Sequence, residues 1–283
     1  MSKIPFPAWQ RPHWQSSNED ILLQFFVFGK FQSGRAPSLD YGSEGLPEGV
    51  ETTSHNHAQL RQWDGYPLRG SVGRMFKDGA PEAYRQAIDA PEVLVIRGRL
   101  PDSADTGYLR DTLGVLAALL DMGGVAILDP QTLNLYDADT WRRHFVVRDG
   151  APIRNHLLIL RDAEQNGNYW IHTRGMRKFG RPDISIRNVP EADSDRAGLL
   201  CERLVELEAL GARFAEGQEL EADGMSLVAT LVARSMPPTT RRWSPYFRNC
   251  AATPATMPTN STCSAATSRC PWSWHWAMSR CRC

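Results

Sequence analysis

The residues best suited to chemistry lie in one short segment, Ile171–Asp183, which reads IHTRGMRKFGRPD. A histidine can exchange a proton near neutral pH, and arginines make paired hydrogen bonds to carboxylates and phosphates. The segment contains five basic side chains: His172, Arg174, Arg177, Lys178 and Arg181. These residue types indicate a site for an anionic group, with His172 as a candidate acid or base.

Strand alternation gives part of the segment a defined geometry. Side chains two residues apart share a face of a strand, so His172 and Arg174 are expected side by side. Arg174 and Arg181 are then candidates for a fork that holds a carboxylate or phosphate. Asp183 is a candidate either to orient His172 or to cap a turn.

Two glycines bound a sharp turn within this segment. Gly175 and Gly180 permit backbone conformations that other residues avoid, so the chain can fold around Phe179. One interpretation is a rigid turn with Phe179 in the core and a solvated basic rim; the others are a binding surface or a catalytic site. No activated nucleophile lies nearby in sequence, so we assign no catalytic residue. The candidate binding residues are His172, Arg174, Arg177, Phe179, Arg181 and Asp183.

This same string carries a family resemblance. HTRGMRKFGRPD, following a strand-helix-strand pattern and a hairpin, resembles the signature of a bacterial family of uncharacterised proteins, a domain of unknown function. The resemblance covers about residues 92–234. It implies a bacterial cytosolic α+β protein with further sheet beyond its second helix, and it implies no activity.

The elements expected before this segment begin with a short apolar strand at Ile21–Phe28, followed by a loop-like stretch over 30–62. A helix is predicted over Thr106–Asp121, where four leucines fall on one stripe: Leu109, Leu113, Leu116 and Leu120. Apolar runs at Val93–Ile96 and Val125–Leu128 flank this helix. They predict a β-α-β unit with parallel strands.

The elements expected around and after the segment include a hairpin. Its strands are Asn155–Arg161 and Asn168–Arg174, and Asn166-Gly167 is typical of its turn. A long helix is predicted from Ser194 to Gly217 and a last strand over Met225–Arg234. This order predicts an α+β fold, a mixed sheet with helices packed on one face, for which a ferredoxin-like sandwich is the nearest template.

The last 47 residues, 237–283, differ from the rest in composition. They contain no glycine, leucine, isoleucine or valine, but five of the six cysteines and four of the nine tryptophans. A disulfide-stapled appendage and a Cys/His metal site are two interpretations. A frameshift in a GC-rich gene is the third, and we favour it because the absent residues are those of an ordinary core. We therefore expect three regions: an N-terminal segment 1–91, a core domain 92–236 and a non-native, irregular and disordered tail 237–283.

Charge and composition exclude several classes of partner. The net charge is zero, but all 32 acidic residues precede Pro237 and six arginines follow it, so the body carries −6. An acidic body disfavours nucleic acid. No apolar stretch is long enough for a membrane span, and the N-terminus does not resemble a signal peptide. The body has one cysteine, Cys201, so a cytoplasmic protein is expected. His55 and His57 lack a third metal ligand, and no cofactor motif appears.

Two hypotheses about function remain. The preferred one is a non-enzymatic binding or accessory protein, of the immunity or regulatory type, whose His172–Asp183 turn contacts an acidic protein or an anionic small molecule. The alternative is a small-molecule enzyme in which His172 acts as acid or base. In that case Arg174, Arg181 and Asp183 complete an anion site, which requires a concave pocket joining these side chains.

Overall fold

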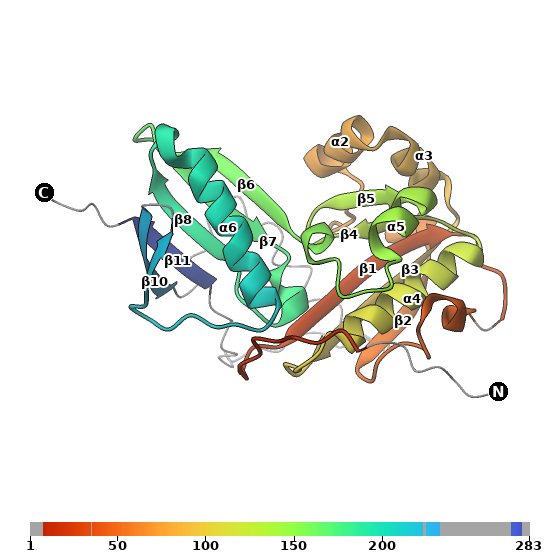
Figure 1. Ribbon diagram of the computed structural model, residues 1–283. Coiled ribbons are helices and arrows are strands. Elements are labelled where there is room, and N and C mark those ends of the chain that lie inside the picture. Colours follow the sequence, from red (N-terminus) through yellow and green to blue (C-terminus); the bar gives the residue numbers. More distant parts are fainter. Residues whose placement is uncertain (1–7, 35, 223–224, 233–272, 279–283) are drawn as a thin grey trace, which may run out of the picture.

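The computed structural model describes residues 8–34, 36–222, 225–232 and 273–278, and these form two β-sheets with helices packed against them (Figure 1). The first sheet has the strand order β2-β3-β1-β4-β5, and each neighbouring pair is antiparallel. Its strands are β1 (Ile21–Gly29), β2 (Val50–Asn56), β3 (Glu92–Leu100), β4 (Gly124–Asp129) and β5 (Asn134–Asp137). The predicted α+β class is confirmed.

The central position of β1 follows from its sequence, ILLQFFVFG, which is apolar on both faces. Such a strand is stable where both of its faces are covered. β1 therefore lies between β3 and β4, and both run antiparallel to it. Residues 93–96 of β3 and 125–128 of β4 were expected to pair directly with each other. In the structure β1 lies between these two strands. The division expected at residue 91 also falls inside this sheet, because β1 and β2 precede it and β3 follows it.

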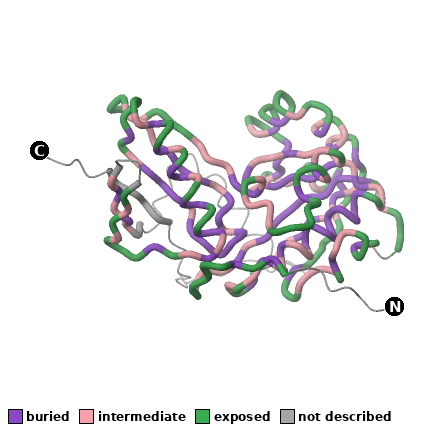
Figure 2. Tube along the Cα trace, viewed as in Figure 1, coloured by how far each residue is buried: buried purple, intermediate pink, exposed green. Residues whose placement is uncertain are grey.

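Helices cover both faces of the first sheet, because the two sets of β1 side chains each need a partner. On one face pack α4 (Gly107–Asp121) and α5 (Ala138–Phe145), and the predicted leucine stripe of α4 is buried there. On the other face α2 (Gly70–Gly79) and α3 (Pro81–Asp89) pack against Phe26 and Phe28. Figure 2 shows how continuous the burial is along β1. The expected arrangement, with helices on one face of a sheet, is found in the second sheet, where the described residues place α6 (Ser194–Ala209) on one face.

The second sheet is mixed, in the order β6-β7-β8-β11-β10-β9. β11 runs parallel to β8, and the other neighbours are antiparallel. Its strands are β6 (Leu158–Ala163), β7 (Tyr169–Arg174), β8 (Ile184–Val189), β9 (Glu219–Ala222), β10 (Met225–Val232) and β11 (Ser273–Met278). The predicted hairpin is confirmed as β6 and β7, and Gly167 in its turn has a φ of 79°.

The helix α6 (Ser194–Ala209) packs on β7 and β8 and ends eight residues before the predicted Gly217. Its end is a Schellman motif, in which Gly211 has a φ of 105°. The amide of Gly211 bonds to the carbonyl of Glu208, and that of Ala212 bonds to the carbonyl of Leu207. The predicted end was too late because the apolar periodicity of the sequence continues to Phe214. The left-handed conformation of Gly211 ends the helix before that residue.

Within the expected tail 237–283, the structure describes only Ser273–Met278, and the remainder lies outside the described residues. Those six residues form β11, between β8 and β10, so Met225–Val232 is not the last strand. Backbone pairing requires only N–H and C=O groups, so a segment without branched aliphatic residues can still join a sheet.

Short helical segments complete the described chain. They are η1 (Ser38–Tyr41), α1 (His57–Leu60), η2 (Ile153–His156), η3 (Met176–Phe179) and η4 (Glu191–Asp193). Of these, η3 contains the middle of the basic segment singled out from the sequence.

Candidate functional site

The basic segment is a rigid turn, as its glycines indicated. Gly175 and Gly180 flank η3 with φ angles of 107° and 61°. A Cβ atom on Gly175 would lie 2.3 Å from the carbonyl oxygen of His156, so only glycine fits there. Phe179 is fully buried, as one interpretation required. The solvated basic rim is smaller than expected, however, because Lys178 and Arg181 are buried as well.

Arg181 is directed into the protein. Its Nη1 lies 3.1 Å from an Asp102 carboxylate oxygen, and its Nη2 donates to the carbonyl of Gly211 at 2.8 Å. Its Nε donates to the carbonyl of Ala212 at 3.1 Å. Burial lowers the pKa of Arg181, and the nearby Arg11 adds to this effect while Asp102 opposes it. The guanidinium is thus held by internal acceptors and is not available for a ligand.

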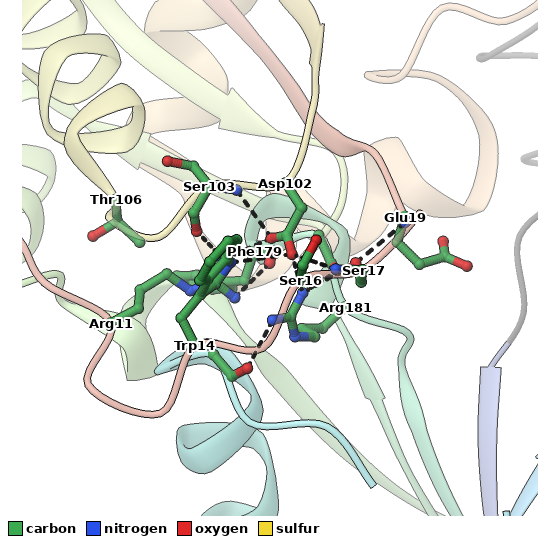
Figure 3. A network of polar contacts seen from close by, with 12 residues as sticks. Arg11, Trp14, Ser16, Ser17, Glu19, Asp102, Ser103, Thr106, Phe179 and Arg181 are labelled. Atoms are coloured by element: carbon green, nitrogen blue, oxygen red, sulfur yellow. Dashed lines mark hydrogen bonds and ion pairs between the residues drawn. The ribbon is translucent and has the colours of Figure 1, made fainter. Parts of the chain in front are cut away.

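Arg11 approaches the same carboxylate from the N-terminal segment (Figure 3). Its Nη1 lies 2.9 Å from Asp102, and its Nη2 donates to the carbonyl of Phe179 at 2.9 Å. Its Nε donates to the carbonyl of Ala209 at 2.9 Å. One aspartate therefore faces two buried arginines. The carbonyls at the C-terminus of α6 supply the remaining negative partial charge, as the helix dipole favours.

A second buried ion pair joins Lys178 of η3 to Asp129 at the end of β4. The Lys178 ammonium also donates to the carbonyl of His156 at 3.0 Å. Asp129 accepts from the amide of Gln131 at 2.9 Å. Burial lowers the pKa of Lys178, although its partner opposes the shift. Two cations of the turn between β7 and β8 therefore bind Asp129 at the end of β4 and Asp102 in the loop that follows β3. We call Gly175–Asp183 with Arg11, Asp102 and Asp129 the inter-sheet clasp.

His172 lies apart from the clasp, whereas Arg177 and Asp183 are part of it. His172 bonds through Nε2 to Asp162 at 3.0 Å and stacks on Trp170, with ring centroids 3.9 Å apart. Burial lowers the pKa of His172. Asp183 does not orient this histidine. It accepts hydrogen bonds from the Thr173 hydroxyl at 3.3 Å and the Met176 amide at 3.2 Å, which is the turn-capping alternative.

The predicted anion site of His172, Arg174 and Arg181 is therefore not formed as the sequence suggested. Arg174 ends β7 and is half-buried, and Arg177 is a half-buried residue of η3. His172 points to Asp162 on β6, whereas Arg181 points to Asp102 beyond β3. Closeness in sequence did not bring these side chains to a common point, because the turn separates the strand face from the clasp.

His57 also has a structural role. Its Nδ1 lies 2.6 Å from the carbonyl of Ala90, and its Nε2 lies 2.6 Å from the Tyr66 hydroxyl. Burial lowers its pKa. Within the described residues, no group of three or more His, Cys, Asp or Glu side chains is arranged to hold a metal ion.

A different place offers an open surface. A hollow of about 430 Å³ lies between β6 and α6, and we call it the α6–β6 groove. Ile159, Ile171 and Leu199 give it an apolar lining, and Leu199 is 59% exposed. Its full lining is Arg154, Ile159, Leu160, Arg161, Ile171, Ser194, Asp195, Gly198, Leu199 and Glu202. Ile171 is buried at the base of the groove, Ile159 is half-buried and Leu199 is exposed, so the groove is an apolar surface that gains free energy when it is covered.

The charges of the groove are paired along its rim. Arg154 lies 2.5 Å from Glu202, and Arg161 lies 3.0 Å from the Ser194 hydroxyl and 3.5 Å from Asp195. The lining thus contains two cations and two anions and carries no net charge. This rim does not favour an anionic ligand.

Gly198 is an unexplained residue in the wall of the groove. It lies inside α6, where glycine costs roughly 1 kcal/mol relative to alanine. A Cβ atom at this position would meet no heavy atom within 4 Å, so no contact in the described structure requires a glycine. Its effect is to widen the groove.

Sequence reasoning missed this groove. Leu199 lies one residue before the buried stripe of α6, and Gly198 interrupts a helical pattern. These were the available signals, but neither indicates which neighbouring strand leaves space above it.

A second hollow, of about 460 Å³, lies at the end of the β6–β7 hairpin. Its polar groups are largely satisfied within the protein: Glu164 bonds to Arg187 at 2.8 Å and to the amide of Asn188 at 2.9 Å. The Arg187 guanidinium lies 4.2 Å from the centre of the Trp170 ring. Because these groups already bind one another, the α6–β6 groove is the better candidate site.

No protein-family model, curated protein or solved structure gives a significant match to the chain. The resemblance to an uncharacterised bacterial family therefore stays a prediction, and function is argued from the site itself. In the described part of the chain, no helix has the length and apolar character needed to cross a membrane.

Proposed function

We propose that the protein is a non-enzymatic binding or accessory protein that contacts its partner through the α6–β6 groove. The observation that carries this proposal is the groove's apolar lining, in which Leu199 is largely exposed and Gly198 leaves space unfilled. The groove also borders β6, which is an edge strand among the residues that the structure describes. Among the described residues the one cysteine is Cys201, and its free, buried thiol agrees with a bacterial cytoplasmic location.

The contact surface in this proposal differs from the one expected from the sequence. Lys178 and Arg181 are paired with Asp129 and Asp102, so the turn gives little attraction for an acidic protein or an anionic small molecule. The groove has no net charge in its lining, and its centre is apolar. We therefore propose a protein partner that covers apolar surface.

An enzymatic role for His172 has weaker support. His172 keeps a carboxylate partner, Asp162, as a general base would need. The expected anion site beside His172 is not formed, because Arg181 is bound to Asp102 and to the carbonyl of Gly211.

The test compares partner capture by three forms of the full chain. Gly198→Trp fills the groove from a position where no heavy atom lies close. The matched control is Leu39→Glu on η1, a site that is 51% exposed and lies on the first half of the chain. Each form is immobilised and exposed to lysate of the organism that encodes it, and circular dichroism checks folding.

We expect a protein that wild type and Leu39→Glu retain and that Gly198→Trp loses. Titration of that purified protein should give an affinity at least about tenfold weaker for Gly198→Trp, as for loss of a central interface contact. Recovery of the same proteins by all three forms contradicts the proposal.

A further inference from the structure

The partner's binding mode can be inferred from the edge of the sheet. We infer that the partner enters the α6–β6 groove as an extended segment that pairs with the edge of β6 that no described strand occupies, and that it adds a strand to the second sheet. This inference rests on the proposed function and specifies its partner as a polypeptide in β conformation.

The first support is the position of β6. In the described chain it is the terminal strand of the second sheet and pairs with β7 alone. An edge strand presents a row of backbone N–H and C=O groups that only another extended backbone can satisfy in register. The groove lies beside this row, because Ile159, Leu160 and Arg161 of β6 form part of its lining.

The second support is the side-chain alternation of β6. Ile159 and Arg161 are two residues apart, so both face the α6 side of the sheet. A strand added at this edge directs every second side chain to the same side. One of these side chains would then lie beside Ile159 and Leu199, in the apolar part of the groove. The added strand would continue the existing sheet without rearrangement of the protein.

The third support is the charge of the rim and the space within it. The pairs Arg154–Glu202 and Arg161–Asp195 enclose the groove without net charge, which matches a neutral apolar side chain better than an ionised one. Gly198 removes the side chain that would otherwise occupy the wall facing β6. A segment with apolar residues at alternate positions fits these features.

The experiment selects random displayed peptides of about seven residues, the length of a typical strand, on wild-type protein. Counter-selection uses Gly198→Trp. Leu199→Glu serves as a second groove variant, since it changes an exposed residue. Selected peptides are then synthesised in pairs, unmodified and N-methylated at alternate backbone nitrogens, and titrated by calorimetry.

We expect enrichment of peptides with apolar residues at alternate positions. N-methylation on the paired side should weaken binding at least about tenfold, and on the opposite side it should have little effect, because only one edge of the peptide pairs with β6. Both groove variants should weaken binding to a similar extent.

Three outcomes overturn the inference: peptides whose affinity survives both methylation patterns, no groove-dependent enrichment, or a wild-type dimer that Gly198→Trp dissociates. The dimer is detected by sedimentation and means that a second copy occupies the edge. If lysate capture still depends on Gly198 while methylation has no effect, the strand-addition inference fails and the proposed function stands. Loss of the groove dependence in both experiments rejects the two together.

Discussion

Asp102 is the residue on which the two halves of the chain converge. It accepts from Arg11 and Arg181, both of which are buried, and it also accepts from the amide of Ser17 at 2.9 Å. Removing the acid from a buried ion pair leaves a charge without compensation, which costs more than the pair itself contributes. The segment that was expected to bind a ligand through its cations uses them to hold the protein together.

Replacing Asp102 tests this role. We expect Asp102→Asn to lower the free energy of unfolding by about 3–5 kcal/mol, because two buried arginines then face a neutral side chain. Urea denaturation measures the change. The control is Asp139→Asn, at an 85% exposed side chain near Arg142, with an expected change within about 0.5 kcal/mol. A loss of less than about 1 kcal/mol for Asp102→Asn contradicts the clasp as a stabilising contact.

The burial of Glu208 predicts that the stability of the protein depends on pH. It is fully buried in α6, and in the described structure no group hydrogen-bonds its two carboxylate oxygens. Burial raises the pKa of Glu208 well above its ordinary value, and the positive charge of Arg181 only partly opposes this. At a pH between the ordinary pKa and the raised pKa of this carboxyl, the folded protein therefore keeps a proton that the unfolded chain releases.

From this direction of shift, the free energy of unfolding of wild type should fall as the pH rises from about 4.5 through the folded pKa, by at most about 1.4 kcal/mol per pH unit. Glu208→Gln lacks this titration. It should match wild type at acidic pH and become progressively more stable than wild type as the pH rises. Glu206→Gln, at an exposed position of the same helix, is the control for loss of a charge. A constant difference between Glu208→Gln and wild type across pH speaks against a buried, neutral Glu208.

At the scale of elements, two glycines with opposite roles explain why the η3 turn is rigid and the groove is open. Gly175 has a positive φ and no room for a Cβ, whereas Gly198 is helical and has free space around it. The first glycine is required by the backbone; the second is not required by any described contact.

Alanine at each position separates these roles. Gly175→Ala should lower the free energy of unfolding by at least about 1–3 kcal/mol, from backbone strain and the close approach of the His156 carbonyl. Gly198→Ala should raise it by about 0.5–1 kcal/mol, because alanine favours the helix. Chemical denaturation measures both. If Gly198→Ala is destabilising, the space beside it is already filled, and the groove is not open as described.

At the scale of the whole molecule, the clasp and a shared core make one cooperative unit of two sheets. The larger hydrophobic core contains Phe25 of β1 and Ile186 of β8 together, and it includes Met176 and Phe179 of the clasp. Buried contacts that cross between sheets couple their unfolding, since neither can open without exposing apolar surface and unpaired charges.

Hydrogen exchange tests the coupling. In wild type, the amides of β1 and β8 should become labelled with similar free energies of opening. In Lys178→Met, which leaves Asp129 buried without its cation, β8 should open at a free energy lower than β1 by at least about 1 kcal/mol. Separate opening of β1 and β8 in wild type argues that the sheets are independent and that the clasp does not couple them.

The sequence by itself determined the local structure of this protein. Apolar periodicity predicted α4, Asn166-Gly167 predicted the β6–β7 hairpin, and the two glycines around Phe179 predicted the turn. These features depend on interactions between residues close in the chain, which periodicity and turn chemistry record directly.

Only the tertiary structure decided what the basic turn does. Lys178 and Arg181 find their aspartates, Asp129 and Asp102, 49 and 79 residues away. The same holds for the sheets, because β1 lies between β3 and β4 and a segment beyond residue 237 supplies β11. A charge in a sequence shows that a partner is needed, but burial and the identity of that partner depend on which distant segments meet.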